Sequence, residues 1–135
     1  MTVTSITFEI PLTPIPKPRP RVTRWGTYTP KRAKDYEDDI KKIAKPYFDK
    51  PITEPCEITL QFTMPIPKST SKKLRGELMY APHTKKTGDV DNLVKAVTDA
   101  LNGIAYEDDS LIWKLEAQKM YGEVGQTVVT IETDQ

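Results

Sequence analysis

Apolar and polar residues alternate with a period of two in two separate stretches of the chain. Between residues 3 and 10 the apolar positions include Ile6, Phe8 and Ile10, and between residues 56 and 64 every second position from Ile58 to Met64 is apolar. Such alternation is typical of a strand with one buried and one exposed face. We therefore predict strands over residues 3–10 and 56–64, and two further strands over 111–121 and 126–133.

A spacing of three and four residues between apolar positions predicts two helices. The first runs from about Lys31 to Lys45 and ends before a proline, because the residue ahead of a proline disfavours helix. The second is capped by Asp91 or Asn92 and reaches Asn102, just ahead of a glycine. The positions of the second helix that we expect to face the core are Leu93, Val97, Ala100, Leu101 and Ile104.

The predicted order β-α-β-α-β-β favours an α/β (α+β) fold, in which two main helices cover a mixed sheet of about four strands. We expect one such two-layer domain over residues 1–135. The proline-rich stretch 11–30 is expected to be an extended loop, because proline cannot continue a central strand. Residues 65–88 are expected to form a long basic connection with a helical turn near 71–79, and connections of that length are usually functional or mobile.

The composition excludes several classes of protein. No apolar run approaches the roughly 18 residues needed to span a membrane, and the first residues lack the pattern of an export signal. The single cysteine, Cys56, excludes an internal disulfide and fits a reducing compartment. We therefore expect a cytoplasmic protein without a membrane partner, in which Cys56 serves as a small apolar residue.

Charge is unevenly distributed along the chain, although the formal net charge is only +1. Residues 13–34 and 65–87 are basic, whereas residues 88–110 are acidic. The basic side chains are Lys17, Arg19, Arg21, Arg24, Lys31, Arg32 and Lys34 in the first segment and Lys68, Lys72, Lys73, Arg75, Lys85 and Lys86 in the second. A phosphate-binding surface around a metal centre has this pattern, and so does a protein whose opposite charges pair with one another.

The acidic stretch GDVDNLVKAVTDALNGIAYEDDS places Asp89 and Asp91 at the start of the second helix and Asp108 and Asp109 beyond its end. Carboxylates near a helix N-terminus serve as caps, which leaves the second pair unexplained. A short loop over 104–107 would return the chain and bring the two pairs together. Clustered carboxylates repel one another unless they are protonated, paired or bound to a cation. Solvated capping and a metal site are therefore both open interpretations.

The type of the ligand atoms and the position of one lysine make the metal-site interpretation more specific. Hard oxygen ligands favour Mg²⁺, Mn²⁺ or Ca²⁺ over zinc, and the spacing does not match a calcium-binding EF-hand loop. Lys95 follows Asp91 by four residues and precedes Asp99 by four, so the three share a helical face. Lys95 has two possible roles: charge stabilisation at a phosphoryl-transfer centre, or an ion pair with one of these aspartates.

The same stretch resembles the signature of the RusA-type Holliday junction resolvases. The shared elements are Asp-x-Asp-Asn-Leu, a lysine four residues after the second aspartate, Asp-Ala-Leu, and a paired Asp-Asp before a strand. The segments KPRPRV and YTPKRAKDYE also resemble parts of that family, so the resemblance extends from about Ile6 to Thr133. It implies a small α/β homodimeric crossover junction endodeoxyribonuclease, often encoded by a phage or prophage. Such an enzyme uses Mg²⁺ to cut four-way DNA junctions with paired symmetric nicks, in DNA recombination and repair.

The resemblance also assigns roles by position. Asp89, Asp91 and Asp109 match the essential carboxylates, and Lys95 matches the essential lysine. Asp108 matches the first aspartate of the pair and is expected to join the other three as a metal ligand, with Mn²⁺ able to replace Mg²⁺. Many relatives carry Lys-Pro directly before the first aspartate, where this chain has Thr-Gly. This departure affects the expected positioning of DNA more than the chemistry.

The resemblance gives the basic segments a use. The side chains expected to contact DNA phosphates are Lys17, Arg19, Arg21, Arg24, Lys72, Lys73, Arg75, Lys85 and Lys86, although any one of them can equally be a solvated loop residue. Trp25 and Tyr28 are candidates for base stacking or for loop anchors. His83 is a candidate to assist the metal or a phosphate, but an exposed histidine in a basic loop, as it is expected to be, usually does neither.

Three other functions are compatible with the sequence. One is a flap or fork nuclease of lower selectivity, and another is a junction-binding protein that does not cut. The third is a metal-binding or protein-interaction module without a DNA partner. The acidic cluster argues against the second, because binding DNA requires no carboxylates. DNA binding that weakens steeply with salt would argue against the third.

Overall fold

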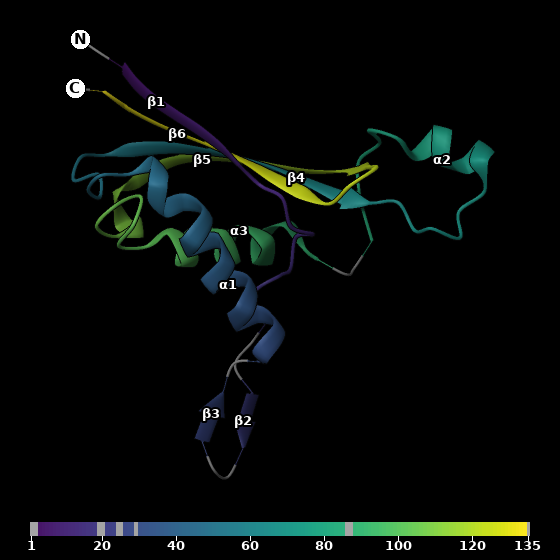
Figure 1. Ribbon diagram of the computed structural model, residues 1–135, viewed down its shortest axis with the longest axis horizontal. Helices are drawn as coiled ribbons and strands as arrows, with labels where there is room; N and C mark the ends of the chain where they lie inside the picture. Colours follow the sequence, from purple (N-terminus) through teal and green to yellow (C-terminus); the bar gives the residue numbers. More distant parts are fainter. Residues whose placement is uncertain (1–2, 19–20, 24–25, 29, 86–87, 135) are drawn as a thin grey trace.

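The computed structural model describes residues 3–18, 21–23, 26–28, 30–85 and 88–134, with the backbone alone described at 3, 21–23, 26–28 and 134. Four strands form one mixed sheet in the order β1-β6-β4-β5 (Figure 1). Their bounds are β1 Val3–Ile10, β6 Gln126–Asp134, β4 Cys56–Pro65 and β5 Ile112–Gly122. Alternate positions of β1, β4 and β6 are buried, as the period of two predicts.

The pairing directions follow from the connections. β5 runs parallel to β4, because the chain between them crosses over through helices, whereas β6 pairs antiparallel with both β4 and β1. A register shift at Cys56 and Glu57 lets β5 bulge near its start, at Trp113. Beyond the bulge, Ile58 of β4 lies beside Leu115 of β5.

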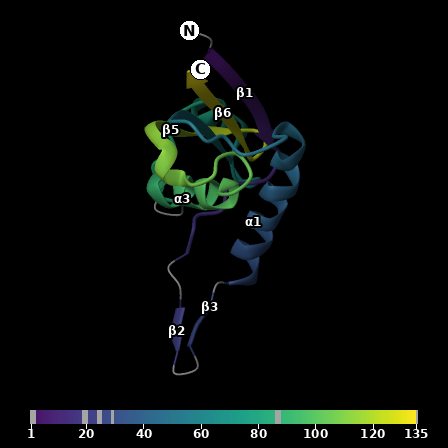
Figure 2. The ribbon, with the colours of Figure 1, turned by 90° about the vertical axis from the view of Figure 1, so that its left-hand side faces the viewer.

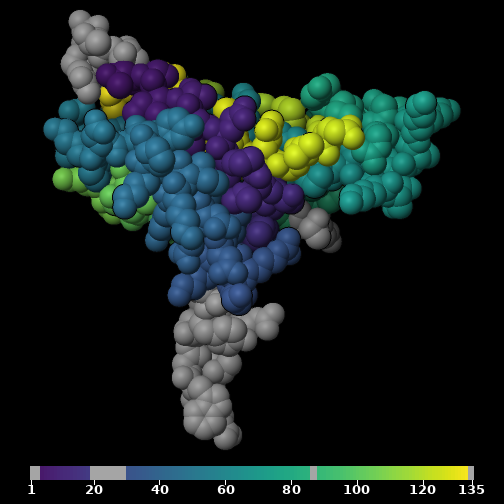
Figure 3. All heavy atoms as spheres, viewed as in Figure 1, coloured from purple at the N-terminus to yellow at the C-terminus, as the bar shows by residue number. Residues whose placement is uncertain are grey.

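Helices cover one face of this sheet, as Figure 1 and the turned view in Figure 2 show. They are α1 (Lys31–Ala44), which continues into the 3-10 turn η1 (Lys45–Tyr47), and α3 (Val90–Leu101). The short α2 (Lys72–Leu78) lies apart from this layer, at one end of the sheet (Figure 3). A second 3-10 turn, η2 (Asp109–Leu111), leads into β5.

The hydrophobic core lies between this helical layer and the sheet. The side chains that are almost completely inaccessible include Ile40 of α1, Leu93, Val97 and Leu101 of α3, and Ile58, Leu60, Phe62, Val129 and Ile131 of the sheet. The opposite face of the sheet is polar, with a hydrogen bond between the Thr7 and Thr130 hydroxyls at 3.1 Å. One face buried and one open defines a two-layer α+β domain, so the predicted fold class is confirmed.

One sequence-based expectation about the fold is wrong. The proline-rich stretch was expected to be an extended loop, but it contains the hairpin β2 (Arg21–Thr23) and β3 (Gly26–Tyr28). This hairpin forms its own two-stranded sheet and lies beyond the end of α1 (Figures 1 and 2). The prolines before it keep it out of the central sheet but do not prevent local pairing.

The loop after α3 is fixed by a buried tyrosine. Tyr106 is completely inaccessible, and its hydroxyl donates a hydrogen bond of 2.7 Å to the carbonyl of Thr98 in α3. Burial, reinforced by the charge of Asp109, raises the pKa of Tyr106. Gly103 takes a φ of +82° as the chain leaves the helix, in the left-handed region that glycine tolerates. The loop is therefore held against α3, as the returning loop of the prediction requires.

The described residues contain no helix that combines the length and the apolar character of a membrane span.

Candidate active site

Asp89 lies at the start of α3. Its carbonyl accepts hydrogen bonds from the amides of Asn92 and Leu93, both at 3.0 Å, which makes it the N-cap residue. The expectation that Asp91 or Asn92 caps the helix is therefore wrong by two or three residues. The Asp89 carboxylate makes no capping hydrogen bond and is exposed. It is free to bind something other than its own helix.

The backbone before Asp89 is held in place by a lysine of β5. The Lys119 ammonium donates a hydrogen bond of 2.9 Å to the carbonyl of Gly88 and a longer one of 3.4 Å to that of Lys85. Gly88 has a φ of +92°, and a Cβ there would lie 3.4 Å from the Met64 side chain. A glycine is therefore required for this turn, and Lys119 satisfies the carbonyl that the turn exposes.

Asp91 and Lys95 lie on the outward flank of α3. At 100° per residue this flank is turned away from the buried stripe that includes Leu93 and Val97. Both side chains are exposed, and the Lys95 ammonium lies 3.4 Å from a carboxylate oxygen of Asp99, one turn further on. Of the two ion pairs that the spacing allowed, the structure contains the one with Asp99.

Asp108 and Asp109, the second aspartate pair, have different surroundings. The carboxylate of Asp108 accepts a hydrogen bond from the amide of Ser110 at 3.2 Å and so caps η2. Hydrogen bonds from the side chain and backbone of Ser110 lower the pKa of Asp108. Asp109 lines a groove of about 290 Å³ with Val94, Thr98 and Trp113, next to the outward flank of α3. The loop thus places Asp109 beside Val94 and Thr98 of α3, without a partner among the described residues, whereas Asp108 is engaged as a cap.

The three unengaged carboxylates have the donor chemistry that a hard divalent cation prefers. In the described part of the chain, the Asp89, Asp91 and Asp109 side chains make no hydrogen bond or ion pair. Among those same residues, however, no three histidine, cysteine, aspartate or glutamate side chains come together as a group that could hold a metal ion. The donor set fits Mg²⁺ in type, and the assignment of Asp89, Asp91, Asp108 and Asp109 as metal ligands stays a prediction.

A cleft of about 730 Å³ opens beside Asp89, which forms part of its lining. Its wall contains the loop from Thr13 to Pro18, whose Lys17 amide donates a hydrogen bond of 2.9 Å to the Asn92 carbonyl. The Lys17 ammonium pairs with Glu37 of α1 and lies 3.4 Å from Asp99 of α3. Burial alone would lower the pKa of Lys17, but the interactions with these two carboxylates raise it overall. Lys17 therefore ties the loop to both helices.

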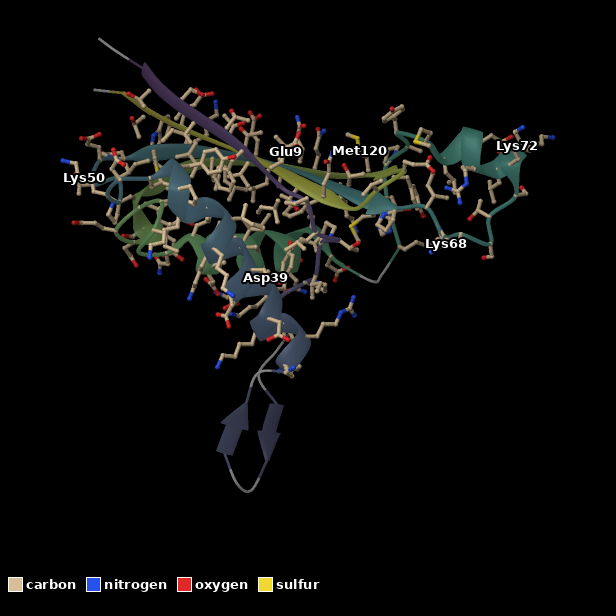
Figure 4. The ribbon with its side chains drawn as sticks, viewed as in Figure 1. Glu9, Asp39, Lys50, Lys68, Lys72 and Met120 are labelled. Atoms are coloured by element: carbon tan, nitrogen blue, oxygen red, sulfur yellow. The ribbon has the colours of Figure 1, made fainter. Side chains whose placement is uncertain are left out.

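The basic side chains expected to contact DNA have different surroundings. Lys72 and Lys73 of α2 are exposed, as is Lys85 beside the cleft, and Figure 4 shows Lys68 and Lys72 at the end of the molecule that carries α2. Arg75 donates a hydrogen bond of 3.0 Å to the Pro67 carbonyl and lies 3.7 Å from Glu123. Arg19, Arg24, Trp25 and Lys86 lie outside the described residues, and only the backbone is described at Arg21 and Tyr28.

Two residues of the site were missed or misplaced by sequence reasoning. Lys119 was assigned no role, because nothing local in a strand marks a contact with a loop more than 30 positions away. His83 was expected to be exposed, but its side chain is only 7 % accessible and packs against Tyr121 with ring centres 4.8 Å apart. Its amide pairs with the Lys119 carbonyl at 3.2 Å, which draws the segment onto the edge of β5.

Two comparisons with known proteins extend these observations. The model of the family described as "Endodeoxyribonuclease RusA" matches residues 11–132, which include every carboxylate discussed above. The uncharacterized protein YqaN of Bacillus subtilis (strain 168) is 35 % identical over 108 residues, covering 76 % of this chain and 75 % of that protein.

The contact made by Lys119 generates a test of how Asp89 is positioned. We expect Lys119→Met to accelerate hydrogen exchange of the Asn92 and Leu93 amides about 10-fold, because the loop before them loses a charged hydrogen-bond donor. Exchange is followed residue by residue by NMR. Lys50→Met, at an exposed site (Figure 4), is the matched control and should leave these amides unchanged. Equal exchange in both variants would show that the loop does not need Lys119.

Proposed function

Because the chain belongs to the RusA endodeoxyribonuclease family, we propose that it is a Mg²⁺-dependent endonuclease that resolves four-way DNA junctions by paired symmetric nicks. Family membership points to a hydrolase acting on DNA. The selectivity for junctions, the metal, the pairing of the nicks and a role in recombination and repair belong to the proposal. The corresponding residues are Asp89, Asp91, Asp109 and Lys95.

The observation that carries the proposal is the set of carboxylates without partners around α3. Asp99 and Asp108 of the same acidic segment have partners, since Lys17 and Lys95 neutralise the first and the second caps η2. Asp89, Asp91 and Asp109 are exposed and unengaged among the described residues, as is Glu107, to which the resemblance gives no role. Unpaired carboxylates at a helix N-terminus cost little, because the helix dipole stabilises them. They remain available for a cation.

Each group of the site has a proposed task. Asp89, Asp91 and Asp109 would hold Mg²⁺, which when bound lowers the pKa of a water and stabilises charge on the phosphate. Lys95 lies one turn after Asp91 on the same flank and is mostly exposed, so its ammonium can approach the scissile phosphate. We propose that Lys95 leaves Asp99 on DNA binding and neutralises charge in the transition state.

The basic side chains divide between DNA binding and structure. Lys72, Lys73, Lys85 and Arg32 are exposed, and we propose that they contact phosphates, which gives the affinity a steep dependence on salt. Lys17 is already paired with two carboxylates, so we propose that it positions the loop beside Asp89 and does not contact DNA. This revises the role expected for Lys17 from the sequence.

Paired nicks require two sites, and the outer edge of β5 supports a homodimer. Among the described residues, no strand pairs with this edge between Ile112 and Gln118. The Trp113 and Leu115 side chains on it are 66 % and 43 % accessible, so two large apolar groups lie on one unpaired strand edge.

Antiparallel pairing of two copies about Leu115 satisfies this edge. It would place Lys114 of each copy opposite Glu116 of the partner subunit, so that the charges are complementary. It would also cover both Leu115 side chains. We therefore propose that two subunits pair through β5, close to the groove that holds Asp109.

The cleavage proposal is tested with a synthetic four-way junction and the matching linear duplex. We expect paired symmetric nicks in the junction alone, abolished by EDTA and reduced at least ~100-fold in Asp91→Asn, because a metal ligand is lost. The matched control is Asp38→Asn, which removes the same charge from an exposed position of α1 and should cut at the wild-type rate.

Two outcomes would contradict the proposal. Cleavage that persists in EDTA would exclude the metal, and equal cleavage by Asp91→Asn and Asp38→Asn would exclude the site. Cutting of flaps or forks as fast as junctions would replace the resolvase by a less selective branched-DNA nuclease.

The interface proposal predicts the mass in solution. Leu115→Glu puts like charges on both sides of the two-fold axis, so light scattering should show a monomer where the wild type is a dimer. Val124→Glu, at an exposed position in the turn before β6, is the control and should remain dimeric. A dimeric Leu115→Glu variant would place the interface elsewhere.

A further inference from the structure

The cleft beside Asp89 is lined by apolar and cationic side chains that have no task in the proposed cleavage chemistry. Prolines of the 13–18 loop, the end of β4 at Met64 and Pro65, and Tyr121 of β5 give it largely apolar walls. Arg32 and Lys85 add two cationic side chains, and Asp89 lies in the same lining. An apolar surface beside cations suits a ligand that is flat and apolar in one part and anionic in another.

His83 is a buried polar side chain of this cleft whose hydrogen bonding is incomplete among the described residues. Its side chain is only 7 % accessible, and its Nδ1 atom is buried with no hydrogen-bond partner in the described part of the chain. A buried nitrogen in this condition costs free energy unless a water or a ligand pairs with it. The imidazole lines the cleft and stacks against Tyr121.

The surroundings of His83 determine what it can bind. Burial lowers the pKa of His83, and the charges of Lys119 and Lys85 lower it further, so the ring is neutral near pH 7. A neutral imidazole presents one donor and one acceptor nitrogen, which matches the mixed edge of a nucleobase. A phosphate alone would be served by the two cations and would leave the apolar walls uncovered.

We propose that this cleft, the His83 cleft, binds one unstacked nucleotide of the DNA substrate. Its base lies among Tyr121, Met64 and the prolines with an edge toward His83, and its phosphate lies toward Lys85 and Arg32. A volume of about 730 Å³ accommodates one nucleotide with accompanying water. The inference rests on the proposed function, because it takes the ligand to be the DNA that Asp89 and its neighbours cut.

The His83 cleft links binding to the shape of the DNA. A base in a continuous duplex is stacked on both sides and must be unpaired before it can enter a pocket, at a cost of a few kcal/mol. A nucleotide at a branch point has already lost part of that stacking. Occupation of a cleft next to Asp89 therefore favours branched over linear DNA, and it positions the strand for cutting near the branch.

The test is a double-mutant cycle in which one change is made in the DNA and the other in the protein, and binding affinity is measured. Nucleotides around the branch point of a four-way junction are replaced one at a time by an abasic residue, and affinity is measured by fluorescence anisotropy in EDTA. We expect one position at which the abasic residue weakens wild-type binding about 10-fold. His83→Ala should weaken binding of the intact junction by a similar factor, and combining both changes should cost nothing further.

Arg32→Gln supplies the contrast within the same cleft. Arg32 is assigned to the phosphate, so its loss should weaken the intact and the abasic junction equally. Lys50→Ala, an exposed site remote from the cleft, should change neither affinity. If His83→Ala does not fold, as judged by circular dichroism, His83→Gln takes its place, with the same non-additivity expected.

The outcomes separate this inference from the proposed function. Full additivity at every position, or no effect of any abasic residue, would overturn the base-binding cleft and leave Arg32 and Lys85 as backbone contacts. Since binding is measured without metal, the cycle shows whether the His83 cleft binds a base even if the protein cuts no DNA. Absence of cutting in Mg²⁺ would overturn only the nuclease, and absence of binding to any junction would overturn both.

Discussion

The burial of one stripe of α3 against the sheet is the constraint on which the site depends. Leu93, Val97 and Leu101 are inaccessible or nearly so, and these positions fix the rotation of the helix about its axis. With that rotation fixed, Asp91 and Lys95 must lie on the outward flank. Asp89 then projects from the N-terminus of the helix toward the His83 cleft. The core therefore determines the direction of every candidate catalytic group on α3.

Hydrogen bonds and ion pairs, two sets of them made by lysines, hold the loops that meet at α3. Lys17 joins the proline-rich loop to Glu37 and Asp99, while Lys119 joins the loop before Asp89 to β5. Tyr106 fixes the loop after the helix through the Thr98 carbonyl. These bonds engage some of the charged groups of the acidic and basic segments. Among the described residues, the carboxylates of the acidic segment that remain unengaged are Glu107 and the three that the family resemblance associates with chemistry, Asp89, Asp91 and Asp109.

Local signals in the sequence were sufficient for the elements, because alternation and helical spacing depend on neighbours along the chain. The four strands of the sheet and both main helices lie within a few residues of their predicted bounds. The N-cap was misassigned, since Asp89, Asp91 and Asn92 are all good capping residues and only the backbone geometry separates them. The hairpin of β2 and β3 was missed because the prolines before it hide a weak pairing signal.

Contacts between segments that are distant in the chain could not be predicted from the sequence. The role of Lys119 and the burial of His83 both arise where the 80–88 segment meets β5, and no local pattern marks either. Of the two charge interpretations, the pairing of opposite charges is confirmed in part, and the phosphate-binding surface around a metal centre stays a prediction. Asp99 pairs with basic residues and Asp108 caps a turn, whereas Asp89, Asp91 and Asp109 remain without partners in the described part of the chain.

The central proposal is that Asp89, Asp91 and Asp109 together bind one divalent cation, although no three such side chains are grouped for it in the described part of the chain. The most direct measurement is an NMR titration of the ¹⁵N-labelled protein with Mn²⁺, whose unpaired electrons broaden signals close to the bound ion. The account predicts selective broadening of residues 88–95 and 107–111 in the wild type, weakened in Asp91→Asn and displaced by Mg²⁺. Broadening centred elsewhere, or equal broadening in Asp91→Asn, would contradict it.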